Sequence, residues 1–227
     1  MKKTFSNFID FKKINPLVVL FSLLIIMWLP SCTKEKLEQT FKGPEVNMGN
    51  GKANSFFKTD ENGNPLEIGF EMTMEAMTGL TQDPLDFANS TFVLPLDQKA
   101  LDLTPFDHLV LDWNSHGHPP VNVFTVPHFD FHFYTITLAE QLAIPPYLPA
   151  TKEKFDNLPP AGFMPASYVS DPGGVPEMGR HWGDPSNPLP FTHVMTYGSY
   201  NGQLNFVEPM VTLALIQAGT TVKKPYA

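Results

Sequence analysis

The clearest pattern along the chain is a strict alternation of polar and aromatic residues from His128 to Tyr134. His128, Asp130 and His132 occupy every second position, and phenylalanines stand between them. Successive side chains of a β-strand point to opposite faces of its sheet. The pattern therefore predicts a strand with one face in an apolar core and another that carries two histidines and an aspartate. The surrounding stretch, residues 121–137, is the strongest strand prediction in the chain because Val, Phe, Thr, Tyr and Ile dominate it.

Shorter apolar and β-branched runs, bounded by turn signals, predict the remaining elements. Strands are expected at residues 53–58, 66–72, 91–96, 108–113, 192–197 and 203–208, with turns at 60–65 and 200–202. Short helices are expected at 72–80 and 137–144, a long proline- and glycine-rich loop at 145–190, and a strand or a short helix at 210–218. The chain contains 23 prolines, which disfavour long helices. The fold class is therefore mainly β, either a single β-sandwich or a cupin-like barrel, with short helices and one long loop.

The first 32 residues have the pattern of an export signal. Four lysines precede an apolar run at residues 16–30, which is shorter than the roughly twenty residues that cross a bilayer comfortably. The segment Leu29-Pro30-Ser31-Cys32 resembles a lipobox, and Cys32 is the only cysteine of the chain. The resemblance implies cleavage before a lipid-modified Cys32 and a lipid-anchored location in the cell envelope, at the outer membrane, in the periplasm or on the cell surface.

Charge and composition then divide the chain into three parts. Residues 1–32 are a predicted lipoprotein signal peptide, 33–52 a flexible polar tether, and 53–227 a β-rich domain. The whole chain has a net charge of −8, and removal of four lysines and Asp10 with the signal leaves 11 basic and 22 acidic residues, a net charge of −11. Nucleic acid is therefore excluded as a partner, because binding it requires a basic surface. The domain after Cys32 has no cysteine for a disulfide, so any additional stabilisation of its fold would have to come from oligomerisation or a metal.

The histidines suggest a metal site. Imidazole and carboxylate groups are common ligands of transition metals, and the candidate ligands here are His116, His118, His128, His132, His181 and Glu208. Residues two apart on a strand can share one ion, which favours the pair of His116 with His118 and that of Asp130 with either flanking histidine. His128 and His132 are about 13 Å apart at Cα and could share an ion only if the strand bends. The zinc-protease pattern His-Glu-x-x-His is rejected, because Phe129 stands where its catalytic glutamate would be. Zn, Mn, Fe and Cu all suit such ligands, and the sequence does not rank them.

Four motifs within residues 50–215 resemble those of a family of uncharacterised bacterial secreted proteins and lipoproteins. They are His-Gly-His-Pro-Pro at 116–120, Pro-His-Phe-Asp-Phe-His-Phe-Tyr at 127–134, Met-Gly-Arg-His-Trp at 178–182 and Phe-Val-Glu-Pro-Met at 206–210. A looser similarity is to cupins, whose His-x-His is mimicked by residues 116–118. No glutamate follows a few residues later, so cupin topology does not follow from it.

Three hypotheses on function remain open. In the first, the domain is a metal-dependent enzyme of the cell envelope, with Asp130 or Glu208 as general base and Tyr134 as proton donor. In the second, it is a non-catalytic module that binds a metal or a small-molecule ligand. In the third, it is a scaffold or homo-oligomer component whose histidines form a structural hydrogen-bond network. His108 and His193 are expected to be structural.

Overall fold

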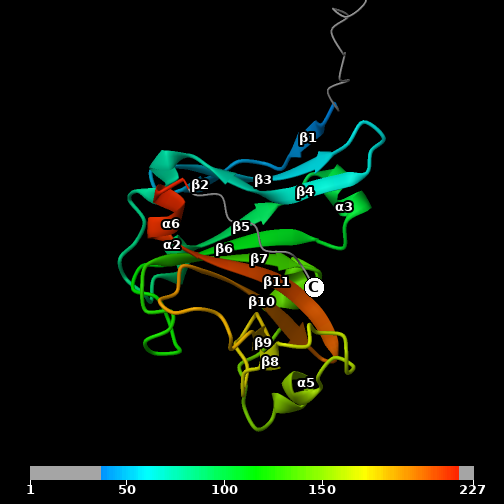
Figure 1. Cartoon of the computed structure of the whole chain (residues 1–227), viewed down its shortest axis with the longest axis vertical. Helices are drawn as coiled ribbons and strands as arrows, with labels where there is room; N and C mark the ends of the chain where they lie inside the picture. Colours follow the sequence, from blue (N-terminus) through cyan, green and yellow to red (C-terminus); the bar gives the residue numbers. More distant parts are fainter. Residues whose placement is uncertain (1–36, 220–227) are drawn as a thin grey trace, which may run out of the picture. The chain divides into compact units, whose positions relative to one another are not determined.

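Two antiparallel β-sheets form the framework of residues 37–219, the part of the chain that this computed structural model describes (Figure 1). The predicted signal peptide, Cys32 and the first residues of the predicted tether lie outside this range. None of the helices within residues 37–219 is long and apolar enough to span a bilayer.

The first sheet is organised around one long central strand, β3. Its strands are β1 (Gln39–Lys42), β2 (Val46–Met48), β3 (Gly51–Thr59) and β4 (Pro65–Met72). β1 and β2 pair with opposite ends of β3, and β4 pairs with β3 from Ala53 to Thr59. The Asp60 carboxylate closes the β3–β4 turn, because it accepts hydrogen bonds from the backbone N–H groups of Asn62 and Asn64. The predicted β3–β4 hairpin is confirmed, but from residue 39 onward the predicted tether is part of this sheet.

The second sheet carries the features relevant to function. Its strand order is β5-β6-β7-β11-β10-β9-β8, with β5 (Thr91–Pro95), β6 (His108–Asn114), β7 (His128–Tyr134), β8 (Val169–Ser170), β9 (Arg180–Gly183), β10 (His193–Tyr200) and β11 (Gln203–Thr212). The sheet is open, since its strand path ends at β5 and β8. The mainly β prediction is confirmed, and the two packed open sheets correspond to its sandwich form.

The main core lies between the two sheets, and the alternation of β7 explains its composition. Phe129 and Phe131 are buried in this core, and Phe133 packs against it. The ring of Phe131 stacks on Phe70 of the first sheet at 4.1 Å, and the ring of Phe129 lies 4.7 Å from Trp113. The apolar face predicted for this strand is therefore confirmed, and the other face, with His128, Asp130 and His132, points away from the first sheet.

The helices are short, as predicted, and several boundaries differ from the predicted ones. The helical segments are η2 (Met74–Met77), α2 (Phe87–Ser90), α3 (Gln98–Leu103), α4 (Leu138–Leu142), α5 (Lys152–Asp156) and α6 (Leu213–Gln217). The helix expected at 72–80 is only the single turn η2. The strand expected at 121–137 begins at His128, because residues 119–127 form turns and bends after Pro119 and Pro120. β11 extends to Thr212 and α6 follows, so residues 210–218 contain both alternatives.

The long segment 145–190 is partly structured, and one arginine links its parts to one another. It includes α5, β8 and β9, which lie at the opposite end of the domain from β1–β4 (Figure 1). The Arg180 guanidinium donates hydrogen bonds to the carbonyl oxygens of Phe155 and Asp171 and pairs with the Asp156 carboxylate. These bonds tie α5 and the loop around Asp171 to β9, which pairs with β10 and so places His181 beside Gly198 in the second sheet.

Candidate metal centre

Polar side chains from neighbouring strands project onto one face of the second sheet. Asp112 on β6 is paired with Asp130 on β7, and the β7–β11 register places Glu208 beside His132. β9 adds His181, which is paired with Gly198 on β10. The ligand atoms that approach one another within 4.8 Å form two groups in the described part of the chain: His118, His128 and Asp130, and His132, His181 and Glu208. We call them the first and the second group.

In the first group, two imidazoles meet one carboxylate. The distance from His128 Nε2 to Asp130 Oδ1 is 3.1 Å, and that from His118 Nε2 to Asp130 Oδ2 is 3.2 Å. The Nδ1 atoms of both rings point outward to carbonyl oxygens, His128 to Val126 at 2.7 Å and His118 to Pro119 at 2.6 Å. A carbonyl oxygen can only accept, so both Nδ1 atoms carry hydrogen, and the neutral form of each ring has its lone pair at Nε2.

The second group is more deeply buried. His132 Nε2 lies 3.4 Å from Glu208 Oε1, and His181 Nε2 lies 3.7 Å from Glu208 Oε2. The Thr196 hydroxyl donates a hydrogen bond to Oε2 of Glu208. On the other side of the His132 ring, Nδ1 lies 3.1 Å from Asp112 Oδ2. A carboxylate behind a ligating histidine is a common arrangement in metal sites, because it fixes the tautomer and orients the ring.

Apolar rings surround both groups. Phe191 packs edge-on against His128 at 5.3 Å between ring centroids, and Phe124 lies 5.6 Å from His118. Phe206 covers both histidines of the second group, at 4.9 Å from His132 and 5.2 Å from His181. The polar atoms thus lie in surroundings of low polarity, where an unpaired charge is costly.

Several of the buried polar atoms have no hydrogen-bond partner. They are Oδ2 of Asp112, Nε2 of His128, Oδ1 of Asp130, and both ring nitrogens of His132. The 3.1 Å contacts between some of these atoms are close but lack the alignment of a hydrogen bond. Buried polar groups are almost always satisfied in folded proteins, so an unpaired cluster requires an explanation such as a bound ion.

Burial and mutual charge shift the titration of the first group. Burial disfavours the charged form of His118, but the hydrogen bond to Asp130 and its charge outweigh this and raise the pKa of His118 to about 9. Burial also acts against ionisation of Asp130, yet the hydrogen bond from His118 and the close contact with the His128 ring hold its pKa far below the usual value. Asp130 is therefore anionic at neutral pH and attracts cations.

The second group shows opposite shifts in its two histidines. Burial disfavours the charged form of His132, but the negative charges of Glu208 and Asp112 raise its pKa to about 9. Burial and the positive charge of His132 lower the pKa of His181 to about 3. Burial raises the pKa of Glu208 to about 7. Without a metal, His181 is thus neutral at pH 7 and ready to donate a lone pair.

The structure brings together five of the six predicted ligands and leaves one apart. His116 is exposed and bonded to the Ser115 hydroxyl, and it belongs to neither group. The expected pair of His116 with His118 therefore does not form, because Gly117 has a φ of +71° and the chain turns between them. Asp130, predicted as a general base or a ligand neighbour, is a member of the first group.

Tyr134 does not reach either group as a proton donor. Its side chain is fully buried, its hydroxyl donates to the Glu177 carbonyl oxygen at 3.3 Å, and burial raises its pKa far above the usual value. The ring is stacked between His108 and His132. His108 is bonded to Asp107 and Gln141, in agreement with the structural role expected for it.

Three residues around the groups were not predicted from the sequence. Asp112 and Thr196 contact the second group, and Asn114 donates to Asp130 Oδ2 at 2.8 Å. A signal for two of them was present, because Asp112 and Asn114 alternate with the core residues Leu111 and Trp113. No signal pointed to Thr196, which depends on the pairing of β10 with β11.

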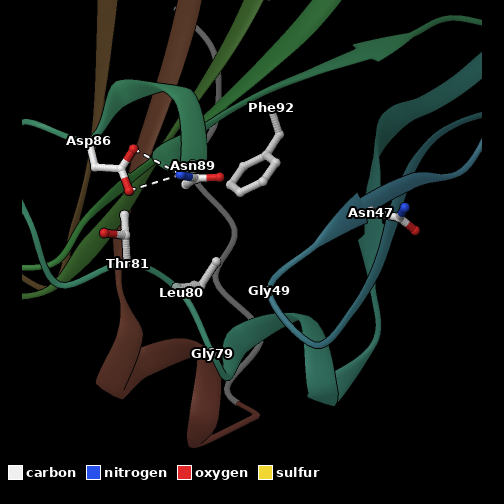
Figure 2. Close-up of a pocket in the computed structure, with 8 residues that line it drawn as sticks. All are labelled: Asn47, Gly49, Gly79, Leu80, Thr81, Asp86, Asn89 and Phe92. Atoms are coloured by element: carbon white, nitrogen blue, oxygen red, sulfur yellow. Dashed lines mark hydrogen bonds between the residues drawn. The ribbon is translucent and has the colours of Figure 1, made fainter.

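A hollow of about 440 Å³ lies elsewhere, between residues of both sheets (Figure 2). Figure 2 shows that its only carboxylate, Asp86, is already bonded to the Asn89 amide, at 2.9 Å. Phe92, Leu80 and glycines make up much of the remaining wall. None of the histidines lines this hollow, so the candidate chemistry remains with the two groups.

Comparisons with known proteins give one short match. A family model described as "TTHB210-like: Hypothetical protein TTHB210" matches residues 60–113. These residues run from the β3–β4 turn to β6 and include Asp112 but no member of either group. The match agrees with a resemblance to uncharacterised proteins, while all four motifs quoted for that resemblance lie outside it. No curated protein and no solved structure matches the chain.

Proposed function

We propose that the protein binds a divalent transition metal through His132, His181 and Glu208, and that a lipid on Cys32 anchors it in the cell envelope. The observation that carries the metal proposal is His132, which is fully buried, has no hydrogen bond at either ring nitrogen, and faces the Glu208 carboxylate. The neutral form of His181 completes a set of two imidazoles and one carboxylate, which suits Zn, Mn, Fe or Cu.

A purely structural histidine network is the main alternative, and the contacts argue against it. Such a network is stabilising only when its members satisfy one another. His108 shows what satisfaction looks like in this protein, since both of its ring nitrogens have partners. The buried atoms of His128, Asp130 and His132 lack such partners.

Three protein ligands also leave room for chemistry. A metal held in this way keeps a position for water or a substrate and acts there as a Lewis acid. Thr196 orients the Glu208 carboxylate, and Asp112 faces the far side of the His132 ring. Both contacts hold the ligands in place before an ion arrives.

The test is the metal content of the full chain, produced without an affinity tag and measured before and after incubation with each of the four metals. At least one equivalent of a tightly bound transition metal is expected. His181→Ala should lower the content, whereas His116→Ala, which removes an exposed histidine outside both groups, should leave it unchanged. A folded protein that takes up none of the four metals would overturn the proposal.

A further inference from the structure

The first group is a second set of candidate ligand atoms, separate from the one proposed above. Its carboxylate, Asp130, lies on β7 between His128 and His132, about 7 Å from each at Cα. The His128 ring is directed to Asp130, whereas the His132 ring is directed to Glu208 and Asp112. β7 thus carries two sets of ligand atoms, one toward each end.

A bend in β7 could have joined the two sets, but the strand does not bend. All seven of its residues pair with β6 in one unbroken register, from His128 with Asn114 to Tyr134 with His108. The phenylalanines on its other face are fixed in the core between the sheets. His128 and His132 therefore stay four residues apart on a regular strand and lie in different groups.

We infer that the protein holds two divalent metal ions side by side along β7, the second bound by His118, His128 and Asp130. This inference rests on the proposed function, because it assumes that the second group binds an ion. The first group is equally prepared for one: backbone carbonyls fix both imidazoles with Nε2 inward, and the amide of Asn114 orients the Asp130 carboxylate. His128 Nε2 and Asp130 Oδ1 are buried and unpaired, which points to a ligand between them.

The two sites differ in access to solvent. The His118 side chain is 34% exposed, and it belongs to the loop between β6 and β7. In the second group the most exposed ligand, the His181 side chain, is 21% exposed, and the His132 side chain is fully buried. The ion of the first group should therefore exchange faster with a chelator than the ion of the second.

The experiment is a Zn²⁺ titration of the full chain, followed by chelator extraction over time. His118→Ala and His181→Ala are a matched pair, because each removes the most exposed histidine of one group and neither residue lies in the core between the sheets. His116→Ala and His193→Ala are controls for loss of a histidine outside the groups, and circular dichroism verifies folding of every variant.

Two equivalents of Zn²⁺ are expected for the unmodified protein and for both controls. Each single group variant should retain one equivalent, the double variant none, and the fast phase of extraction should be lost only in His118→Ala. One equivalent in the unmodified protein, unaffected by His118→Ala, would overturn the second ion and leave the proposed function intact. A single ion lost in both variants would show one shared site and also overturn the inference. No bound Zn²⁺ would overturn the inference, and the proposed function would fall with it if Mn, Fe and Cu were not bound either.

Discussion

The carboxylate of Asp112 provides a sharp test of the second group, because it supports the site without occupying a ligand position. Asp112 Oδ2 lies 3.1 Å from His132 Nδ1, and Oδ1 accepts a hydrogen bond from the Thr91 hydroxyl at 2.6 Å. In Asp112→Asn the amide keeps the shape of the side chain but removes its charge. An amide N–H turned toward Nδ1 would also favour the wrong tautomer of His132.

The expected effect follows from the contribution of such partners to metal affinity. Loss of a group that orients a ligating histidine weakens binding by about 10- to 100-fold, which is about 1.4 to 2.7 kcal/mol. At a free metal concentration about 100 times the Kd, binding stabilises the folded protein by about 2.7 kcal/mol, and the weaker Kd lowers this to about 1.4 to 0.4 kcal/mol. Since about 1 kcal/mol corresponds to about 2–4 °C for a domain of this size, the rise in Tm on adding metal should fall from about 5–11 °C to about 1–6 °C.

The assay is thermal unfolding with and without Zn²⁺ in a His118→Ala background, so that only the second group responds. Asp107→Asn is the matched control, because Asp107 also contacts a histidine, His108, at 2.9 Å, but the other ring nitrogen of His108 is bonded to Gln141. An unchanged rise in Tm for Asp112→Asn, or an equal loss for Asp107→Asn, would refute the reasoning.

Three further predictions concern the loop, the pH dependence and the anchor. Gly117→Ala should remove the ion of the first group and spare that of the second, because a Cβ at φ +71° would lie 1.9 Å from the Phe124 carbonyl oxygen. The Zn²⁺ stoichiometry of the variant measures this, and two retained ions would contradict it. The free energy of unfolding of the metal-free protein, measured by urea titration, should fall from pH 7 to 9. The pKa values of His118 and His132 are both raised to about 9 in the folded state, so protonation of these rings stabilises the fold fully below pH 6.5 and no longer does so once the pH passes 9. A flat profile, or a slope that survives in the His118→Ala, His132→Ala double variant, would argue against it. Cys32→Ser should abolish incorporation of labelled palmitate, whereas Ser31→Ala should retain it; label in the serine variant would disprove lipidation at Cys32.

Much of the site could be predicted because it depends on one strand. The alternation from His128 to Tyr134 defines both faces of β7 from sequence alone, and the structure confirms the apolar one in the core. The same spacing indicated that His128 and His132 would not share an ion on a straight strand, and they lie in different groups.

The remaining features depend on contacts between segments far apart in sequence. His181 reaches the second group only because β9 pairs with β10, and Thr196 reaches it through the β10–β11 register. Neither pairing leaves a local pattern in the sequence. The separation of His116 from His118 depends on a single turn at Gly117, which the motif His-Gly-His does not specify. β1 was missed because its residues are mostly polar and exposed, and β2 because it is only three residues long.

The regular pairing of β7 also has a consequence for ion selectivity. A shift of the strand by one residue would turn the phenylalanines out of the core and the ligand side chains into it. The packing of the core therefore fixes the positions of His128, Asp130 and His132. Ligands held in this way cannot move far to suit an incoming ion. Discrimination among metals then rests on whether the ion accepts the spacing that the strand imposes, as with a rigid macrocycle, whose cavity size decides which cation it retains.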